Sequence, residues 1–478
     1  FFIATGLIEA IWGFRQLQGW AYSNHSLFRL TGSFFNPGPY SGYLAITLPV
    51  ALGILLEQSK RNMPYYLSMG CIGTAIVVLP AGMSRSAWIA VVVSCAWVYA
   101  LYRLDRKQAA TRLRQHKRWY IIGGILGGIL LLGGSASLYT LKKDSADGRF
   151  LMWKITTKAI QKQPITGTSL GGFPAAYAET QAEYMASGKA TEQEKLVAGC
   201  PEYAFNEYLQ IGLEQGLVGL ALFIGWLGLL FYKGIKNKRY ACCGGLMSMA
   251  IFAFSSYPLQ LPEFWVVLIF LGVMSVTPDK DEIRENQAES NGHRWGKQIF
   301  FMGIAILGIG LFWMQKDHYK AYQQWNKAQM FYNNKAYEAA LEVYEPLYPL
   351  LKHKPEFLFE VAQCLSKTGR YEKANGYLER AVLLSSDPML YYVMAKNEQC
   401  LGEYRQAEKH LLHAIDILPE RIYPYYLLMN LYTEPSYFQP AKLKKAIDSV
   451  LTKKPKVESS AIKEMKEKAR SMLNNTSI

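Results

Sequence analysis

Two arginines of this chain lie where a guanidinium group can do chemistry. Arg85 begins an apolar segment after "AGMS", and Arg149 follows Asp147 and Gly148 at the start of the amphipathic stretch "FLMWKITTKAI". Guanidinium groups bind phosphate oxygens in a bidentate way and stay charged at physiological pH. Two of them on one face of a membrane suit a diphosphate, because they also stabilise charge that grows on a diphosphate leaving group. The alternative for Arg85 is a side chain that snorkels to lipid phosphates.

Polar residues also crowd the stretch "GCPEYAFNEYLQIGLEQGLVGL", which runs directly into an apolar segment. Polar groups at such a depth are expensive in a membrane and usually do chemistry or line a path. If 203–216 is a helix, Glu207 and Glu214 lie seven positions apart on one face, and Asn206 and Gln210 lie four apart on a neighbouring face. These side chains are therefore predicted to line a vestibule.

Two of the carboxylates in this stretch keep an ordinary alternative. Glu214 can instead pair with an arginine across a helix bundle, and Glu202 can be an exposed loop carboxylate.

The elements that position these residues are membrane helices. Of the 478 residues, 50% are hydrophobic, and they gather in long runs instead of recurring periodically. Because about 20 residues cross a bilayer, the runs predict nine spans: 1–17, 40–56, 64–81, 85–102, 119–140, 217–232, 240–257, 262–277 and 297–314. The chain has no initiator Met and no signal-peptide pattern, so we expect it to begin inside a longer protein with further spans upstream.

The basic residues predict the orientation of the spans. The segment "RLDRKQAATRLRQHKR" carries seven Lys or Arg residues and "YKGIKNKRY" carries four, and such loops stay on the cytoplasmic side. Alternation from these loops places four regions on the outer face: 18–39, 82–84, the long loop 141–205 and everything after 314. A net charge of +15 thus reflects topology instead of nucleic-acid binding.

The seven cysteines show no CxxC or other metal-ligand spacing. Cys71, Cys95, Cys242 and Cys243 lie in or beside spans and are expected to pack as small apolar residues. Three cysteines on the outer side give no disulfide framework, although a bridge between Cys364 and Cys400 stays an alternative.

A repeated pattern follows the last span. Tyr337, Tyr371 and Tyr404 are spaced 34 and 33 residues apart, and each is followed three residues later by an alanine, Ala340, Ala374 or Ala407. Pro355, Pro388 and Pro419 close the three units, which cover 319–423. The period resembles the tetratricopeptide repeat, a pair of antiparallel helices that stacks into a solenoid with a concave face for peptides or proteins. We expect further helices over 424–470, and the tyrosines are interpreted as core residues of the repeats.

The predicted fold is all-α, with two domains. A polytopic membrane helix bundle over 1–318, with the outer loop 141–205, precedes a soluble α-solenoid over 319–478 on the outer side.

Four stretches in one order resemble a known family. "TGSFFNPGPYSGYLA", "SRSAW", "GRFLMWK…PITGTSLGGF" and "AFNEYLQIGLEQGLVGL", within about 25–275, are similar to the O-antigen ligase and polymerase superfamily, which includes bacterial protein O-oligosaccharyltransferases. The resemblance implies a C-type glycosyltransferase fold in the bacterial inner membrane, with the repeats in the periplasm. It implies transfer of a glycan from undecaprenyl diphosphate to an acceptor hydroxyl, with no metal or other cofactor.

The resemblance also assigns roles. It implies that Arg85 and Arg149 hold the diphosphate, with Arg29 as a further candidate. Ligases of the family typically have a histidine before the Asn of the last stretch, and this position is Phe205, which cannot take a proton. Glu202 and Glu207 are the carboxylates available nearby.

The sequence allows several functions. The acceptor can be an exported protein, the lipid A core or a growing polysaccharide, and the repeats favour a protein acceptor or partner. A transporter of lipid-linked glycans would need charges at mid-depth along a two-sided path, whereas the polar groups here gather on one face. A membrane-anchored scaffold would need only one span.

Overall fold

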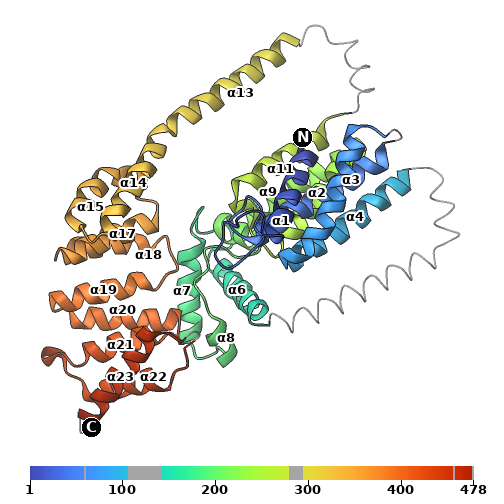
Figure 1. Ribbon diagram of the computed structural model, residues 1–478. Coiled ribbons are helices and arrows are strands. Elements are labelled where there is room, and N and C mark those ends of the chain that lie inside the picture. The colour runs from blue at the N-terminus through green and yellow to red at the C-terminus, as the bar shows by residue number, and fades with distance from the viewer. Residues whose placement is uncertain (59–60, 106–142, 279–293, 456–457, 476–478) are drawn as a thin grey trace. The chain divides into compact units, whose positions relative to one another are not determined.

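The computed structural model describes residues 1–58, 61–105, 143–278, 294–455 and 458–475 (Figure 1). Every regular element in these ranges is a helix, which confirms the all-α prediction. Two compact units divide the chain, and they do not follow its order. The membrane unit comprises 1–146, 164–166 and 203–291, and the repeat unit comprises 147–163, 167–202 and 292–478.

The membrane unit is built from apolar helices. They are α1 (Phe2–Leu17), α2 (Pro37–Glu57), α3 (Met63–Val78), η1 (Leu79–Gly82), α4 (Arg85–Asp105), α9 (Glu207–Lys236), α10 (Tyr240–Ala253), η2 (Pro258–Gln260) and α11 (Pro262–Val276).

Helix α2 forms the core of this unit and packs against α1, α3, α4 and α10. Small residues permit the close packing, as is usual between membrane helices. Gly42 faces the ring of Phe252, and Gly53 faces Ala241. The hydroxyl of Ser248 donates to the carbonyl of Ala45 at 2.7 Å, which ties α10 to α2.

The predicted spans within the described residues coincide with helices, whereas the predicted span 119–140 lies outside those residues. Within the described part of the chain, four helices are long and apolar enough to cross a membrane: Pro37–Glu57, Met63–Gly82, Arg85–Asp105 and Glu207–Lys236. Two shorter apolar helices, α10 and α11, accompany them. Many large apolar side chains on these helices are exposed, as expected of surfaces that face lipid.

The repeat unit contains the predicted solenoid. Its helices are α13 (Arg294–Met314), α14 (Lys316–Asn333), α15 (Tyr337–Tyr344), η3 (Glu345–Leu347), α16 (Tyr348–Leu351), α17 (Pro355–Lys367), α18 (Tyr371–Val382), α19 (Met389–Leu401), α20 (Tyr404–Ile417), α21 (Ile422–Leu431), η4 (Pro435–Tyr437), α22 (Pro440–Thr452) and α23 (Ser460–Asn475).

The marker residues explain how the repeats pack. Each of the three tyrosines begins the second helix of its pair, and each of the three alanines is fully buried one turn later. A small side chain at this position lets paired helices approach closely. The tyrosines themselves are half-buried at the edge of the core. Cys364 and Cys400 are free thiols, so the alternative of a bridge between them is wrong. Burial raises the pKa of Cys364 to about 12.

The long loop before α9 belongs to the repeat unit. It forms part of α6 (Lys143–Lys162), then α7 (Phe173–Ala186) and α8 (Glu192–Val197). Helix α7 packs alongside α20, as Figure 1 shows. Gln181 is fully buried in this contact, and its amide nitrogen donates to the carbonyl oxygens of Ile417, at 2.8 Å, and Gly199, at 3.1 Å. The repeats therefore hold a segment that the sequence places between membrane spans.

Candidate active site

The polar stretch before the apolar span of α9 begins with a strained turn. Phe205 adopts a left-handed conformation, with φ of 49°, which is uncommon for a bulky residue. Its ring lies against Tyr257, with centroids 4.9 Å apart, and Tyr203 stacks on the same tyrosine at 5.3 Å. The residue at the usual histidine position thus contributes to an aromatic cluster.

Asn206 then starts α9. Its side-chain oxygen accepts a hydrogen bond from the backbone nitrogen of Leu209 at 3.1 Å, which satisfies a free donor of the first turn. The sequence predicted that Asn206 and Gln210 lie close together on a helix. That prediction assumed a helix over 203–216, whereas α9 begins at Glu207, so Asn206 caps the helix and Gln210 lies one turn inside it; both side chains are buried.

The next turns present a row of buried polar side chains. Glu207 is 1% exposed, and its carboxylate accepts hydrogen bonds from the backbone nitrogen of Leu259 at 2.6 Å and the side chain of Gln260 at 2.9 Å. Gln210 accepts from the backbone nitrogen of Ala204 at 3.0 Å and donates to Glu214 at 3.3 Å. The row fixes the entrance of α9 to the turn between α10 and α11.

Helix α9 is broken directly after this row. Gly216 has φ of 69° and ψ of −178°, a conformation that essentially only glycine adopts. The break frees the backbone nitrogen of Leu217, which donates to the carbonyl oxygen of Pro164 at 2.8 Å. A short polar helix over 207–215 therefore precedes the apolar span over 217–236, as the composition of the stretch predicted.

Arg85 begins α4 after a second tight turn, in which Met83 has φ of 48°. The indole nitrogen of Trp88 donates to the carbonyl oxygen of Leu79 at 3.1 Å and holds this turn against the helix. Gly82 lies so close to Ser41 that an added Cβ would come within 2.1 Å of its hydroxyl. Two stretches that the sequence singled out, "NPGPYSGYLA" and "AGMSRSAW", are thus in contact.

An open pocket lies between the start of α4, the first turn of α9 and the end of α10. It has a volume of about 390 Å³ and is lined by Ser86, Ile89, Tyr208, Ala250, Ile251, Phe254 and Ser255. Ser86 directly follows Arg85, and Tyr208 directly follows Glu207. The tyrosine hydroxyl donates to the carbonyl oxygen of Ala250 at 2.9 Å. The walls are mainly apolar, with polar groups from two of the predicted motifs, as is typical of ligand sites.

Arg29 lies in the exposed part of the loop between α1 and α2. This loop is organised by Gln16, which is 2% exposed and which the sequence analysis did not single out. Its amide oxygen accepts from the backbone nitrogens of Thr31 at 2.9 Å and Gly32 at 2.8 Å, and its amide nitrogen donates to the carbonyl of Tyr22 at 2.9 Å. One buried glutamine thus holds both sides of the segment that carries Arg29.

Arg149 and Glu202 belong to the repeat unit, whereas the other predicted site residues belong to the membrane unit. Arg149 is half-buried on α6. One turn further along α6, Lys154 donates to Glu194 at 2.7 Å and to the hydroxyl of Tyr184 at 2.6 Å. Burial acts to raise the pKa of Glu194, but hydrogen bonds from Lys154, Thr191 and Tyr184 outweigh it and lower the pKa to about 2. This network ties the helix of Arg149 to α7 and α8.

The sequence also did not predict two residues that contact the site, Gln260 and Tyr257. Gln260 and Tyr257 lie in "SSYPLQLPEF", whose two prolines flank a glutamine between apolar residues. A polar residue in that setting was the available signal. Within the described residues, no group of His, Cys, Asp and Glu side chains is arranged to hold a metal ion.

Two parts of the chain match known families. Residues 69–224 match the family described as O-Antigen ligase, and residues 333–414 match the family described as Anaphase-promoting complex, cyclosome, subunit 3. The first match contains the motifs at Arg85, Arg149 and Asn206, and the second covers helical repeats. No curated protein matches the chain.

Proposed function

Because the chain carries an O-antigen ligase domain followed by repeats of the tetratricopeptide type, we propose that it transfers a preassembled glycan from undecaprenyl diphosphate to an acceptor hydroxyl at the periplasmic face of the inner membrane. The family makes it a membrane glycosyltransferase of the O-antigen ligase or polymerase type. The donor and the side of the membrane are part of the proposal.

The cavity between α4 and α9 carries this proposal. It is an open pocket of about 390 Å³ in which Ser86, the residue after Arg85, and Tyr208, the residue after Glu207, line the same space. Among the described spans, α2 and α4 carry charged residues only at their ends, and α3 and α10 carry none. The exception is Glu9 near the centre of α1, whose carboxylate accepts from the backbone nitrogen of Ser33 in the loop after α1. One-sided chemistry fits this distribution better than transport, which needs polar groups along a path through the membrane.

The reaction requires charge stabilisation and a proton acceptor. The acceptor oxygen attacks the anomeric carbon of the glycan, the bond from this carbon to the diphosphate oxygen breaks, and the electron pair leaves with undecaprenyl diphosphate. In the proposal, Arg85 binds the diphosphate oxygens, on which negative charge increases in the transition state. Arg149 is assigned the same role, supported by its place in the "GRFLMWK" motif alone, and Arg29 is a further candidate.

The carboxylates divide into two proposed roles. Glu207, Gln210 and Glu214 are positioning residues, because the hydrogen bonds of Glu207 and Gln210 hold the entrance of α9 in place. The proton of the acceptor hydroxyl has to leave as the bond to carbon forms. Glu202 is exposed whereas Glu207 is 1% exposed, so Glu202 is the better candidate of the two to contact the acceptor molecule.

We favour a protein or the lipid A core as the acceptor, which makes the enzyme a protein O-oligosaccharyltransferase or an O-antigen ligase. A solenoid that offers a surface to polypeptides supports the protein acceptor. A growing polysaccharide is the alternative acceptor, and it makes the enzyme a polymerase.

The test is transfer by the purified chain in nanodiscs. An undecaprenyl diphosphate oligosaccharide is the donor, with an exported protein rich in Ser and Thr and a lipid A core as parallel acceptors. We expect Arg85→Ala to lower the rate by about 10²–10³, the range for removing one stabiliser of transition-state charge. Arg85→Lys should recover only part of the loss, because the bidentate geometry is missing.

Arg103→Ala is the matched control, since Arg103 lies at the opposite end of the same helix. Full activity of Arg85→Ala, or an equal loss in Arg103→Ala, would refute the diphosphate assignment. Elongation of the donor with both acceptors unmodified would identify a polymerase.

A further inference from the structure

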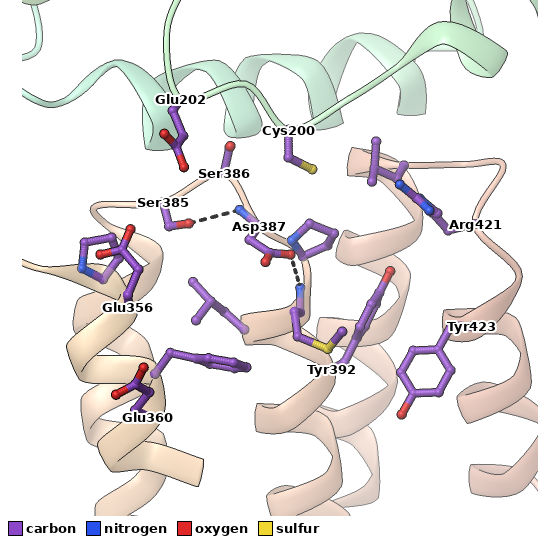
Figure 2. A pocket seen from close by; sticks show the side chains of 16 residues that line it. Cys200, Glu202, Glu356, Glu360, Ser385, Ser386, Asp387, Tyr392, Arg421 and Tyr423 are labelled. Atoms are coloured by element: carbon purple, nitrogen blue, oxygen red, sulfur yellow. Dashed lines mark hydrogen bonds between the residues drawn. The ribbon is translucent and has the colours of Figure 1, made fainter. Parts of the chain in front are cut away.

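The repeat unit contains a cavity of about 700 Å³, which Glu202 lines and which is distinct from the pocket beside α4. This size lies within the range of about 300–1,000 Å³ typical of ligand sites. One wall is formed by Cys200 and Glu202 of the non-helical segment 198–206, and the other walls are the first turns of α17 and α19 and the connection from α20 to α21 (Figure 2).

The wall that includes Glu202 is itself a polypeptide segment bound by the repeats. Ser386 of the repeats donates its hydroxyl to the carbonyl oxygen of Pro201 at 3.1 Å, and Gln181 of α7, which also donates to Ile417 of α20, donates to the carbonyl oxygen of Gly199 at 3.1 Å. Both contacts are made to backbone carbonyls and not to side chains. This edge of the solenoid therefore already binds one non-helical segment through main-chain groups that any polypeptide offers.

Charge is distributed unevenly along the cavity. Figure 2 shows Glu202, Glu356 and Glu360 at one end and Arg421 at the other, with Asp387 between them. Lys396 adds a second cation at the end of Arg421, where its nitrogen donates to the hydroxyl of Tyr423.

The three glutamates differ in their hydrogen bonds and ion pairs. Glu360 accepts hydrogen bonds from Trp325 and Tyr344, each at 2.7 Å, and so has a structural role. Glu202 and Glu356 are exposed, and neither takes part in an ion pair within the ranges that the structure describes. Carboxylates that share one end of a cavity repel each other, and a bound cation reverses this cost.

We propose that this cavity binds a non-helical segment of an acceptor polypeptide, with a Lys or Arg side chain at the end formed by Glu202 and Glu356. The inference rests on the protein-acceptor form of the proposed function. Tyr392 and Phe359 supply apolar surface for a neighbouring side chain. An anionic glycan would be repelled by the carboxylates.

The test measures peptide binding to the full chain in detergent, without lipid donor. The probe is a fluorescein-labelled, end-blocked hexapeptide, Gly-Val-Lys-Thr-Val-Lys, and its counterpart has Glu in place of Lys. We expect the Lys peptide to bind at least about tenfold more tightly, the combined effect of two exposed ion pairs. The difference should shrink as salt is added, because exposed charges are screened.

Glu356→Lys should lower the affinity for the Lys peptide by about tenfold and raise the affinity for the Glu peptide. Glu379→Lys is the matched control: it makes the same change in net charge at an exposed position on α18 that does not line the cavity. It should leave both affinities unchanged.

Equal binding of the two peptides, or equal effects of Glu356→Lys and Glu379→Lys, would overturn the proposal. So would displacement of the probe by the free oligosaccharide alone, which would identify a glycan site. The binding test contains no donor, so its result does not depend on glycan transfer. If the Lys peptide binds more tightly but no glycan is transferred to protein in the nanodisc assay, only the proposed function is refuted. If glycan is transferred to protein but the two peptides bind equally, only this inference is refuted.

Discussion

The buried amide of Gln181 offers a direct test of how the repeats hold the outer loop. Its nitrogen donates to the carbonyls of Gly199 and Ile417, and its oxygen accepts from the hydroxyl of Tyr177 at 2.7 Å. Tyr177 and Ile417 are 2% and 1% exposed, so water cannot replace the lost partner at either group. Gln181→Leu keeps a similar volume and removes all three hydrogen bonds.

The magnitude follows from the groups left without partners. A buried polar group that loses its partner costs about 1–3 kcal/mol. The Tyr177 hydroxyl and the Ile417 carbonyl together therefore destabilise the contact by about 3 kcal/mol, while the half-buried Gly199 carbonyl can bind water. Since 1.4 kcal/mol is tenfold in an equilibrium constant, protection against hydrogen exchange should fall by about 100-fold.

The assay is amide hydrogen exchange of the full chain in detergent, compared between α7, α20 and α2. We expect the loss of protection in α7 and α20 and not in α2, which belongs to the membrane unit. Glu179→Gln is the control on the same helix. Glu179 is exposed and lies 3.4 Å from His413, so its loss should cost less than about 1 kcal/mol. Equal protection in the two variants, or a loss as large in α2, would refute the reasoning.

Two further predictions concern backbone strain and charge. Gly216→Ala should lower the melting temperature in detergent, because a residue with a side chain pays about 1–3 kcal/mol for φ of 69° and ψ of −178°. The control is Gly225→Ala, in the helical part of α9 with open space around it, which should be neutral or stabilising. Equal effects of the two changes would contradict the strain argument. The lowered pKa of Glu194 predicts a contribution to stability that is complete above the ordinary value of 4.5 and is lost as the pH falls toward 2. The melting temperature of the repeat unit should therefore fall as the pH is lowered through this window, and it should fall less steeply in Glu194→Gln than in the wild type. Equal slopes of melting temperature against pH would count against the network around Lys154.

Local patterns predicted the helices well. Apolar run length placed the spans, whereas the helix assumed over 203–216 begins only at Glu207, after the Asn206 cap, and is interrupted at Gly216. The 33- and 34-residue spacing placed the second helix of each repeat at its tyrosine. These features depend on residues within one or two turns of each other, so a single sequence contains the information.

Partners that are far apart in sequence could not be predicted in this way. Glu207 was singled out as a carboxylate near the acceptor, but its hydrogen bonds to Leu259 and Gln260 depend on how α9 packs against the turn after α10. The contact between Gln181 and Ile417 joins residues 236 positions apart. No local pattern connects such positions, because tertiary packing decides which buried polar groups meet.

The grouping of the outer loop with the repeats changes how the repeats can affect catalysis. Arg149 lies on α6, Lys154 ties α6 to Tyr184 of α7, and Gln181 ties α7 to α20 of the solenoid. A change that loosens the repeats therefore also loosens the helix that carries a proposed diphosphate ligand. An activity defect in a repeat variant consequently has two physical sources, lost acceptor binding and a displaced α6. Two measurements without donor separate these sources. Glu356→Lys should weaken peptide binding and leave the hydrogen-exchange protection of α7 unchanged. Gln181→Leu should instead reduce the protection of α7.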